Sequence, residues 1–347
     1  MRVSIVGAGG DIGRQIAVTL IEERAVPRSG AIQLVARAGG PSEVLVRGLT
    51  VDLKDAEAEH LPALDWVSDP DAVDGDVVIF AAGRTVSTDP NAVTPRDELA
   101  AENVALFETW AEQLGRRFDG QEFVLVVSNP VELAVRSFAR RHDPARVIGM
   151  GAHLDTMRFR RELARDLGLR REQVQGFVLG EHGAGQVPCW STVSSWADRR
   201  RGEAEPALAL RRQDAPSIGE SFDALRRLMV AADYDGAYAL LEALPPDVRA
   251  AVKPFYAHLT GAKTPLGTAQ AVANLVRTIG DGTMAFTAAQ VEVEGRFCDL
   301  DAVTGVPVRL SNQGAVVEQL DLWDDEVAAV QRTAAAFGEL ARSVGLG

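Results

Sequence analysis

Short apolar runs alternate with helical patterns through the first 150 residues. The runs occupy residues 2–7, 32–35, 76–82 and 122–127. Near-continuous apolar runs are typical of parallel strands that helices cover on both faces. One helical pattern follows the first run, with Ile12, Ile16 and Leu20 on one face, and another lies at residues 96–114. This alternation predicts a doubly wound α/β sheet, which binds ligands at the carboxyl ends of its strands.

The pattern changes after residue 150. An amphipathic helical pattern at residues 155–167 is followed by a strand-like run at residues 176–179. A long connection, residues 191–262, then has helical periodicity that we expect prolines such as Pro245 and Pro254 to interrupt. Its role is open between a surface elaboration, an oligomer contact and part of the pocket wall.

The last part of the chain mixes strands and helices without regular alternation. A helical pattern begins at Thr264. It leads to predicted strands at residues 285–293, 296–300 and 306–310, and to a final helix from Asp324. This order predicts an α+β unit behind the parallel sheet.

Composition and charge indicate which kind of protein the chain forms and which partners it is expected to lack. The chain has 347 residues, of which 46% are hydrophobic and 24% charged, as in ordinary globular proteins. With 36 basic and 49 acidic residues the net charge is −13, so we expect no nucleic-acid partner and no anionic membrane partner. No apolar run approaches the roughly 18 residues of a membrane-spanning helix, and a strand pattern starts directly after Met1. We expect a cytoplasmic protein.

The two cysteines, Cys189 and Cys298, are too few for a disulfide framework and lack the spacing of metal ligands. We expect both to be buried small residues. The sequence predicts no metal site.

A glycine-rich turn separates the first strand-like run from the first helical pattern. Gly7, Gly10 and Gly13 allow a tight turn, close approach of a pyrophosphate and close packing of helix on strand. The following helix N-terminus supplies N–H donors. The alternative is a plain loop, but the strand–turn–helix–strand context favours dinucleotide binding. We assign the cofactor to Gly7, Gly10, Asp11, Ile12, Gly13, Ala36, Arg37, Ser42, Ala82, Gly83, Asn103, Ser128 and Asn129.

The end of the second strand bears on the choice of cofactor. An acidic residue there would accept hydrogen bonds from a ribose and repel a 2′-phosphate, but the sequence has Ala36 and Arg37. A guanidinium suits a phosphate, and Ser42 offers a further donor. We therefore expect NADP to be favoured, with NAD possible. The alternative is that Arg37 stacks on the adenine or lies in solvent.

Asp155, Arg158 and His182 form the candidate catalytic group. Asp155 and Arg158 stand three residues apart in a predicted helix, so both point to one side. His182 follows the strand-like run at residues 176–179, between two glycines. A histidine that a carboxylate orients, beside a fork-shaped anion binder, predicts proton transfer on a substrate with a carboxylate.

Each of these residues has a structural alternative. Asp155 alone is a common helix cap, Arg158 alone is most often a solvated ion pair, and a lone histidine such as His182 is usually structural. The prediction rests on their combination.

Several motifs together resemble the lactate/malate dehydrogenase family, and they occur in the family's order along nearly the whole chain. The motifs are Arg96-Asp97-Glu98-Leu99, Ser128-Asn129-Pro130-Val131, Asp155-x-x-Arg158, Gly180-Glu181-His182-Gly183 and Thr304-Gly305-Val306-Pro307-Val308. The spacing of the glycine turn resembles the malate dehydrogenase branch. The resemblance implies a Rossmann-type dinucleotide-binding domain at residues 1–150, a catalytic domain at residues 151–347, and a homodimer or homotetramer.

The resemblance also implies roles for single residues in hydride transfer between a nicotinamide and C2 of a small 2-hydroxy or 2-oxo acid. His182 is the acid in reduction and the base in oxidation, Asp155 orients it, and Arg158 binds the substrate carboxylate. The remaining substrate residues are Arg96, Asn129 and Thr264, of which Arg96 polarises the reacting carbonyl. The alternative for Arg96 is an ion pair at a helix start.

The loop before Arg96 departs from the family pattern. Family members acting on malate have a second arginine about seven residues earlier, where this chain has Asp89, and lactate-type members have a glutamine. An acidic residue disfavours a second carboxylate, so we expect neither standard malate nor lactate chemistry. The alternative is that Asp89 points to solvent and Arg84 has taken the role.

Two rival functions remain open. A nicotinamide-dependent glycosidase resembles this fold, but its metal is held by Cys and His, and Ser128 with no cysteine nearby disfavours it. The second rival is a nucleotide-binding regulator without turnover, against which the combination of Asp155, Arg158 and His182 argues.

Overall fold

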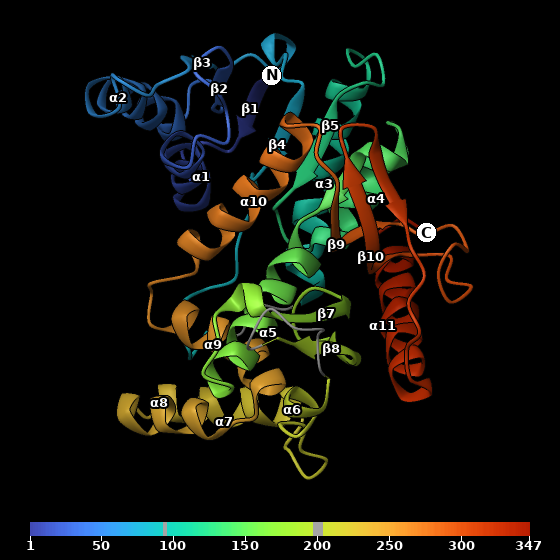
Figure 1. Ribbon diagram of the computed structural model, residues 1–347. Helices are drawn as coiled ribbons and strands as arrows, with labels where there is room; N and C mark the ends of the chain where they lie inside the picture. Colours follow the sequence, from blue (N-terminus) through green and yellow to red (C-terminus); the bar gives the residue numbers. More distant parts are fainter. Residues whose placement is uncertain (93–95, 197–203) are drawn as a thin grey trace.

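The computed structural model describes residues 1–92, 96–196 and 204–347, with only the main chain at residues 96–98. Its described strands form one 11-stranded sheet, in the order β3-β2-β1-β4-β5-β6-β9-β10-β7-β8, with β11 paired to β10 (Figure 1). The first six strands of this order pair in parallel, and the remaining pairs are antiparallel. A parallel and an antiparallel half therefore meet at β6 and β9.

The parallel half alternates strands and helices. Its strands are β1 (Arg2–Val6), β2 (Ala31–Val35), β3 (Ala63–Val67), β4 (Val77–Phe80), β5 (Phe123–Val126) and β6 (Val147–Gly149). Its helices are α1 (Asp11–Glu22), α2 (Pro41–Ala56), α3 (Arg96–Gly115) and α4 (Val131–Ala139), with 3-10 turns at Pro70–Ala72 and Pro144–Arg146. The predicted doubly wound sheet is confirmed.

The second half combines antiparallel strands with helices (Figure 1). Its strands are β7 (Val174–Gly180), β8 (Gln186–Ser195), β9 (Ala285–Glu292), β10 (Val303–Ser311) and β11 (Gly314–Val317). Its helices are α5 (Gly151–Asp166), α6 (Glu205–Leu208), α7 (Ile218–Val230), α8 (Tyr234–Ala243), α9 (Pro246–Leu259), α10 (Pro265–Gly280) and α11 (Asp324–Ser343), with a 3-10 turn at Arg171–Gln173. The order is that of an α+β unit.

Apolar side chains from both halves form one continuous core. At its centre Phe80 at the end of β4 packs edge-on against Phe107 of α3 and Phe138 of α4, with ring centroids 5.8 and 5.0 Å apart. All three rings are almost completely buried. Burying such large apolar surfaces fixes α3 and α4 on the sheet, and with them the chain segments that follow β4 and β5.

The described part of the connection at residues 191–262, whose role the sequence left open, is mainly a helical layer with its own small core. Leu225 and Met229 of α7, Leu241 of α8 and Val252 of α9 are buried together. Figure 1 shows α7 and α8 at the lower end of the molecule, with α9 beside α5. Within the described residues none of the helices is long and apolar enough to cross a membrane.

Three expectations about the second half are wrong. Residues 296–300 form a turn and not a strand, because the chain reverses there with Cys298 and Asp299 at φ 49° and 55°. Cys298 is consequently only partly buried, unlike Cys189. Pro254 lies inside α9 and does not interrupt it, which shows that tertiary packing of α9 outweighs the roughly 3 kcal/mol cost of an internal proline.

Candidate functional site

The predicted catalytic group comes together at the end of β7. The strand stops at Gly180, whose φ of 80° favours glycine, and the following turn carries His182. His182 Nδ1 lies 2.6 Å from Asp155 Oδ2, and Arg158 Nη1 lies 3.1 Å from Asp155 Oδ1. One carboxylate of α5 thus contacts both the imidazole and the guanidinium, so the structure joins the three residues that the sequence singled out.

The electrostatics of this group favour a charged imidazole. Asp155 is only 1% exposed. Burial alone would lower the pKa of His182, but the charge and the hydrogen bond of Asp155 outweigh it and the pKa is raised. Burial lowers the pKa of Arg158, opposed by Asp155, yet a guanidinium stays charged at any ordinary pH. The site therefore holds a cation that can release a proton beside a permanent cation.

Two residues that the sequence analysis missed hold His182 in place. The main-chain N–H of His182 donates to Oε1 of Glu132 on α4 at 2.7 Å, and Glu132 is only 3% exposed. Gly151, the first residue of α5, lies directly against the ring. Glu132 had a signal in the sequence, since it follows Val131 of the Ser-Asn-Pro-Val motif, whereas a glycine at a helix start had none.

The ends of β4 and β5 are tied together by polar side chains. The Ser128 hydroxyl donates to the carbonyl of Ala82 at 2.6 Å. Asn103 is 1% exposed; its Oδ1 accepts from the main-chain N–H of Arg84, and its Nδ2 donates to the carbonyls of Arg84 and Asn129. The Asn129 side chain is exposed, and the bond to the following proline is cis. Asn103 thus acts on the loop and not as a free donor, whereas Asn129 is accessible.

The glycine turn has the close packing that its spacing predicts. Gly7 has φ 88°, and a Cβ atom there would lie 2.7 Å from the carbonyl oxygen of Ala81. A Cβ atom on Gly13 would overlap the main chain of Gly7. Gly10 caps α1 without any side-chain hydrogen bond and is exposed. The N–H donors of the first turn of α1 are therefore open to an anion, which fits a dinucleotide pyrophosphate.

Asp11 connects this turn to the second half of the chain. Its carboxylate pairs with Lys263, just before α10, and with Arg14. The hydrogen bonds from Lys263 and then Arg14 lower the pKa of Asp11. Asp11 is thus neutralised by its neighbours, while Ile12 beside it is partly buried against the core.

Ala36 and Arg37, on which the cofactor prediction depends, follow directly after β2. Ala36 is buried, with its N–H bonded to the carbonyl of Val67. Arg37 is exposed, and none of the described residues forms an ion pair with it. Its main-chain N–H lies 3.3 Å from the hydroxyl of Ser42, which in turn lies against Gly9 of the glycine turn.

The loop before α3 is folded on itself and bound to the helical layer. Asp89 is exposed, and its Oδ1 accepts from the N–H and the side chain of Asn91. Arg84 pairs with Glu102 of α3. Arg226 of α7 donates to the carbonyl of Pro90 at 3.0 Å, and His258 of α9 donates to the carbonyl of Ser87 at 3.1 Å. These hydrogen bonds join α7 and α9 directly to the loop before α3.

The remaining predicted substrate residues are less defined. Arg96 begins α3, but its side chain lies outside the described residues. Thr264 precedes α10 and is half-buried, without a capping hydrogen bond from its side chain. In the described part of the chain, Asp89 and Arg84 are not bonded to Asp155, Arg158 or His182.

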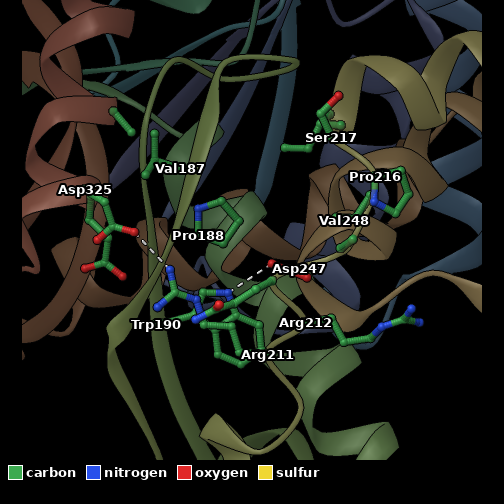
Figure 2. Close-up of a pocket in the computed structure, with 15 residues that line it drawn as sticks. Val187, Pro188, Trp190, Arg211, Arg212, Pro216, Ser217, Asp247, Val248 and Asp325 are labelled. Carbon is green, nitrogen blue, oxygen red and sulfur yellow. Dashed lines mark hydrogen bonds and ion pairs between the residues drawn. The ribbon is translucent and has the colours of Figure 1, made fainter.

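A separate pocket of about 500 Å³ lies at the edge strand β8. It lies between the starts of α9 and α11, under the segment that leads into α7. Figure 2 shows Arg211 pairing with Asp325 and Trp190 donating to Asp247 across it. None of the described residues that line it is a predicted site residue. Of its other charged residues, Arg212 pairs with Asp214 and Glu326 accepts from the main-chain N–H of Ser191.

Comparison with known proteins identifies relatives of this chain. A model of the lactate/malate dehydrogenase NAD binding domain matches residues 1–149. The malate dehydrogenase of Methanothermobacter thermautotrophicus is 30% identical over 322 residues, which cover 90% of this chain and 87% of the relative. The L-2-hydroxycarboxylate dehydrogenase (NAD(P)(+)) of Methanocaldococcus jannaschii is 25% identical over 355 residues, covering 96% of both chains.

A solved structure has the same fold. It is a lactate dehydrogenase from a Medee basin deep-sea metagenome library, with a TM-score of 0.77 and 20% identity, and the match covers 99% of this chain and 98% of that chain.

Proposed function

Because this chain belongs to the lactate/malate dehydrogenase family, we propose that it transfers a hydride between a nicotinamide cofactor and C2 of a small 2-hydroxy or 2-oxo acid. The observation that carries the proposal is the contact of Asp155 with both His182 and Arg158, at 2.6 and 3.1 Å. This arrangement combines a proton donor with an anion-binding group in one site.

The proton chemistry follows from the hydrogen bond to Asp155. An ionised carboxylate only accepts hydrogen bonds, so Nδ1 of His182 carries a proton and Nε2 is left for the substrate. In reduction Nε2–H gives its proton to the carbonyl oxygen on C2, which becomes the hydroxyl oxygen. In oxidation Nε2 takes the hydroxyl proton back. Asp155 fixes the tautomer and stabilises the imidazolium in both directions.

Arg158 would bind the substrate carboxylate. Its Nη1 contacts Asp155, and no other described carboxylate pairs with it, so further N–H donors of the planar guanidinium are available for a bidentate contact. Its low exposure, 20% of the side chain, strengthens such a contact because little water competes. Asn129 would donate a hydrogen bond to the reacting oxygen, and Thr264 would line the pocket; both roles are proposals.

The cofactor would be held by residues at the ends of β1, β2, β4 and β5. The open first turn of α1 after Gly10 suits its pyrophosphate, and the exposed Arg37 suits an adenosine phosphate. Gly7, Gly13, Ala82, Gly83 and Ser128 would shape the rest of the groove. When bound, the nicotinamide supplies or accepts the hydride.

We further propose a preference for NADP. Its support is that Ala36 leaves no carboxylate at the end of β2 to repel a 2′-phosphate, while Arg37 is exposed and unpaired among the described residues. The expected preference is about tenfold or more in kcat/KM, if Arg37 contributes on the order of 1.4 kcal/mol. Arg37→Ala should weaken NADPH much more than NADH, and Ala36→Asp should favour NADH. Equal kcat/KM for both cofactors in the natural protein would contradict the preference.

The substrate is proposed to be a 2-oxo acid that is larger or less anionic than oxaloacetate. The support is the acidic Asp89 on the loop before α3, where malate-specific relatives of the family have an arginine. Efficient oxaloacetate reduction that is lost in Arg84→Ala would show instead that Arg84 binds the distal carboxylate.

The test of the proposed function is a panel of 2-oxo acids, assayed with NADPH and with NADH. Oxidation of either cofactor by at least one 2-oxo acid supports the proposal. A chain that binds the cofactor but oxidises it with none of the acids would favour the regulator. The division at residue 150 and assembly into a homodimer or homotetramer remain proposals, and light scattering would measure the assembly.

A further inference from the structure

Glu162 is a second buried acid on the helix that carries Asp155 and Arg158. It lies one turn beyond Arg158 in α5 and is only 4% exposed. Its Oε1 accepts from Nζ of Lys253 at 2.8 Å, and its Oε2 accepts from Nε of Arg249 at 2.5 Å. Both cations belong to α9, so each oxygen of this buried carboxylate has its own cation from the helical layer.

Arg158 has a neighbouring carboxylate on each side along α5. Side chains three or four residues apart in a helix are neighbours, so Arg158 lies between Asp155, three residues before it, and Glu162, four residues after it. In the structure Arg158 pairs with Asp155 at 3.1 Å and, among the described residues, with no other carboxylate. A pair with Glu162 would draw the guanidinium along α5, away from Asp155 and from the charge of His182 that it now faces.

The cations of α9 neutralise Glu162 and so remove this competition. Burial alone would raise the pKa of Glu162, but hydrogen bonds from Lys253 and then Arg249 outweigh it and the pKa is lowered, so the carboxylate is ionised. A buried carboxylate without a partner is costly. If a cation of α9 were lost, Glu162 would therefore attract Arg158, whose guanidinium has N–H donors beyond the one that contacts Asp155.

Arg165 of α5 is also close to Glu162 but is engaged elsewhere. It lies 3.7 Å from Oε2, the oxygen that Arg249 already contacts, and its Nη2 pairs with Glu242 of α8 at 2.7 Å. Loss of Lys253 would instead free Oε1.

We propose that Lys253 and Arg249 are positioning residues for substrate binding: by holding Glu162 they keep Arg158 available for the carboxylate of the 2-oxo acid. The proposal rests on the proposed role of Arg158 in binding that carboxylate. Neither cation of α9 is assigned a contact with the substrate. The helical layer would thus act on substrate affinity through α5.

The test is the KM of Lys253→Met for the best 2-oxo acid. Lys253 is suited to substitution because 38% of its side chain is exposed. We expect KM to rise by roughly three- to tenfold, which corresponds to about 0.7–1.4 kcal/mol, while kcat changes less. Structural damage alone would lower kcat through loss of active protein and leave KM unchanged. If Lys253→Met does not fold, Lys253→Gln, which keeps a hydrogen-bond donor but no charge, takes its place with the same expected results.

A second substitution at Glu162 separates positioning from a direct effect of Lys253. In Lys253→Met with Glu162→Gln, the charge that attracts Arg158 is gone, so KM should return towards that of the natural protein. An unchanged KM in Lys253→Met overturns the proposal, and so does a raised KM that Glu162→Gln does not lower.

Glu242→Gln is the matched control. It breaks the ion pair between α8 and Arg165 of α5 but leaves both contacts of Glu162 with α9 in place. We expect the KM of the natural protein. A rise as large as that in Lys253→Met would mean that any weakening of the helical layer against α5 has this effect, which contradicts a specific role of Lys253.

A measurement without turnover distinguishes failure of this proposal from failure of the proposed function. In urea unfolding, the coupling between Arg158→Gln and Glu162→Gln should be larger in the Lys253→Met background than in the natural protein, because the two side chains pair only when Lys253 is absent. Equal coupling in both backgrounds would overturn the positioning role. Inactivity of the natural protein with every 2-oxo acid would instead contradict the proposed hydride transfer.

Discussion

The ring of His182 lies against the main chain of Gly151: a Cβ atom on Gly151 would be 2.5 Å from Cγ of the ring. Real Cβ atoms do not approach other atoms so closely, so Gly151→Ala must displace the imidazole from its place beside Asp155. A displacement of about 1 Å can cost on the order of 10²-fold in rate. We expect kcat to fall by about that factor, with the melting temperature little changed.

The control for this substitution is Gly48→Ala. Gly48 lies in α2 with no atom near its virtual Cβ, so alanine should be neutral or stabilise by about 0.4–1 kcal/mol and leave kcat unchanged. Normal turnover in Gly151→Ala would show that the ring position does not limit the reaction.

The pH dependence of the two directions should be opposite. The pKa of His182 is raised above its ordinary value of 6.5, because Asp155 outweighs the effect of burial. Reduction needs the protonated ring, so its kcat/KM should stay level past pH 6.5 and fall only above the raised pKa. Oxidation needs the neutral ring and should increase over the same range. In Asp155→Asn both midpoints should move to lower pH; a reductive profile that already declines below pH 6.5 would contradict this account.

Because the pKa of His153 is lowered, we expect the protein to lose stability in mild acid. Its Nδ1 lies 2.7 Å from Thr287 Oγ1, and burial, followed by the charges of Arg160 and Arg171, lowers its pKa from 6.5 to about 4. A depressed histidine pKa gives stability that is present above pH 6.5 and lost as the pH falls towards 4, because the unfolded chain binds the proton first. The loss amounts to at most about 3 kcal/mol.

Denaturant unfolding of His153→Asn at several pH values measures this contribution. The variant should lose less stability than the natural protein between pH 6.5 and 4, whereas His60→Asn, at an exposed position, should behave like the natural protein. Parallel curves for the natural protein and His153→Asn would rule out the assignment.

Because Arg226 bonds the loop before α3, we expect the helical layer to contribute to substrate binding. Its bond to the carbonyl of Pro90 joins α7 to the loop before α3. A typical hydrogen bond contributes about 0.5–1.5 kcal/mol, so Arg226→Ala should raise KM by roughly two- to tenfold and speed hydrogen exchange of residues 84–92. Arg227→Ala, an exposed neighbour on the same helix, should change neither. An unaltered exchange rate in Arg226→Ala would mean that the contact does not hold the loop.

The sequence predicted the parts of the structure that follow from local patterns. Apolar runs predicted β1, β2, β4 and β5, because buried parallel strands need such runs. The spacing of Asp155 and Arg158 predicted their shared helix face, because residues three apart in a helix are neighbours. The position of His182 after a strand-like run between glycines predicted a strand-end turn.

What the sequence could not predict depends on contacts between distant segments. Glu132 and His182 are 50 residues apart, and only the pairing of β5, β6, β9, β10 and β7 in one sheet brings α4 to the end of β7. The partners of Arg226 and His258 likewise follow from how α7 and α9 pack. The turn at Cys298 was mistaken for a strand because its apolar residues give no sign of positive φ angles.

Turnover of His182→Asn tests the central claim most directly. General acid–base catalysis contributes about 10²–10⁴-fold, so kcat with the best 2-oxo acid should fall by at least about a hundredfold while NADPH still binds, as measured by fluorescence titration. Arg158→Gln should instead act mainly on substrate affinity. A His182→Asn variant that binds the cofactor and retains near-normal turnover would contradict the proton-transfer site described for Asp155 and His182.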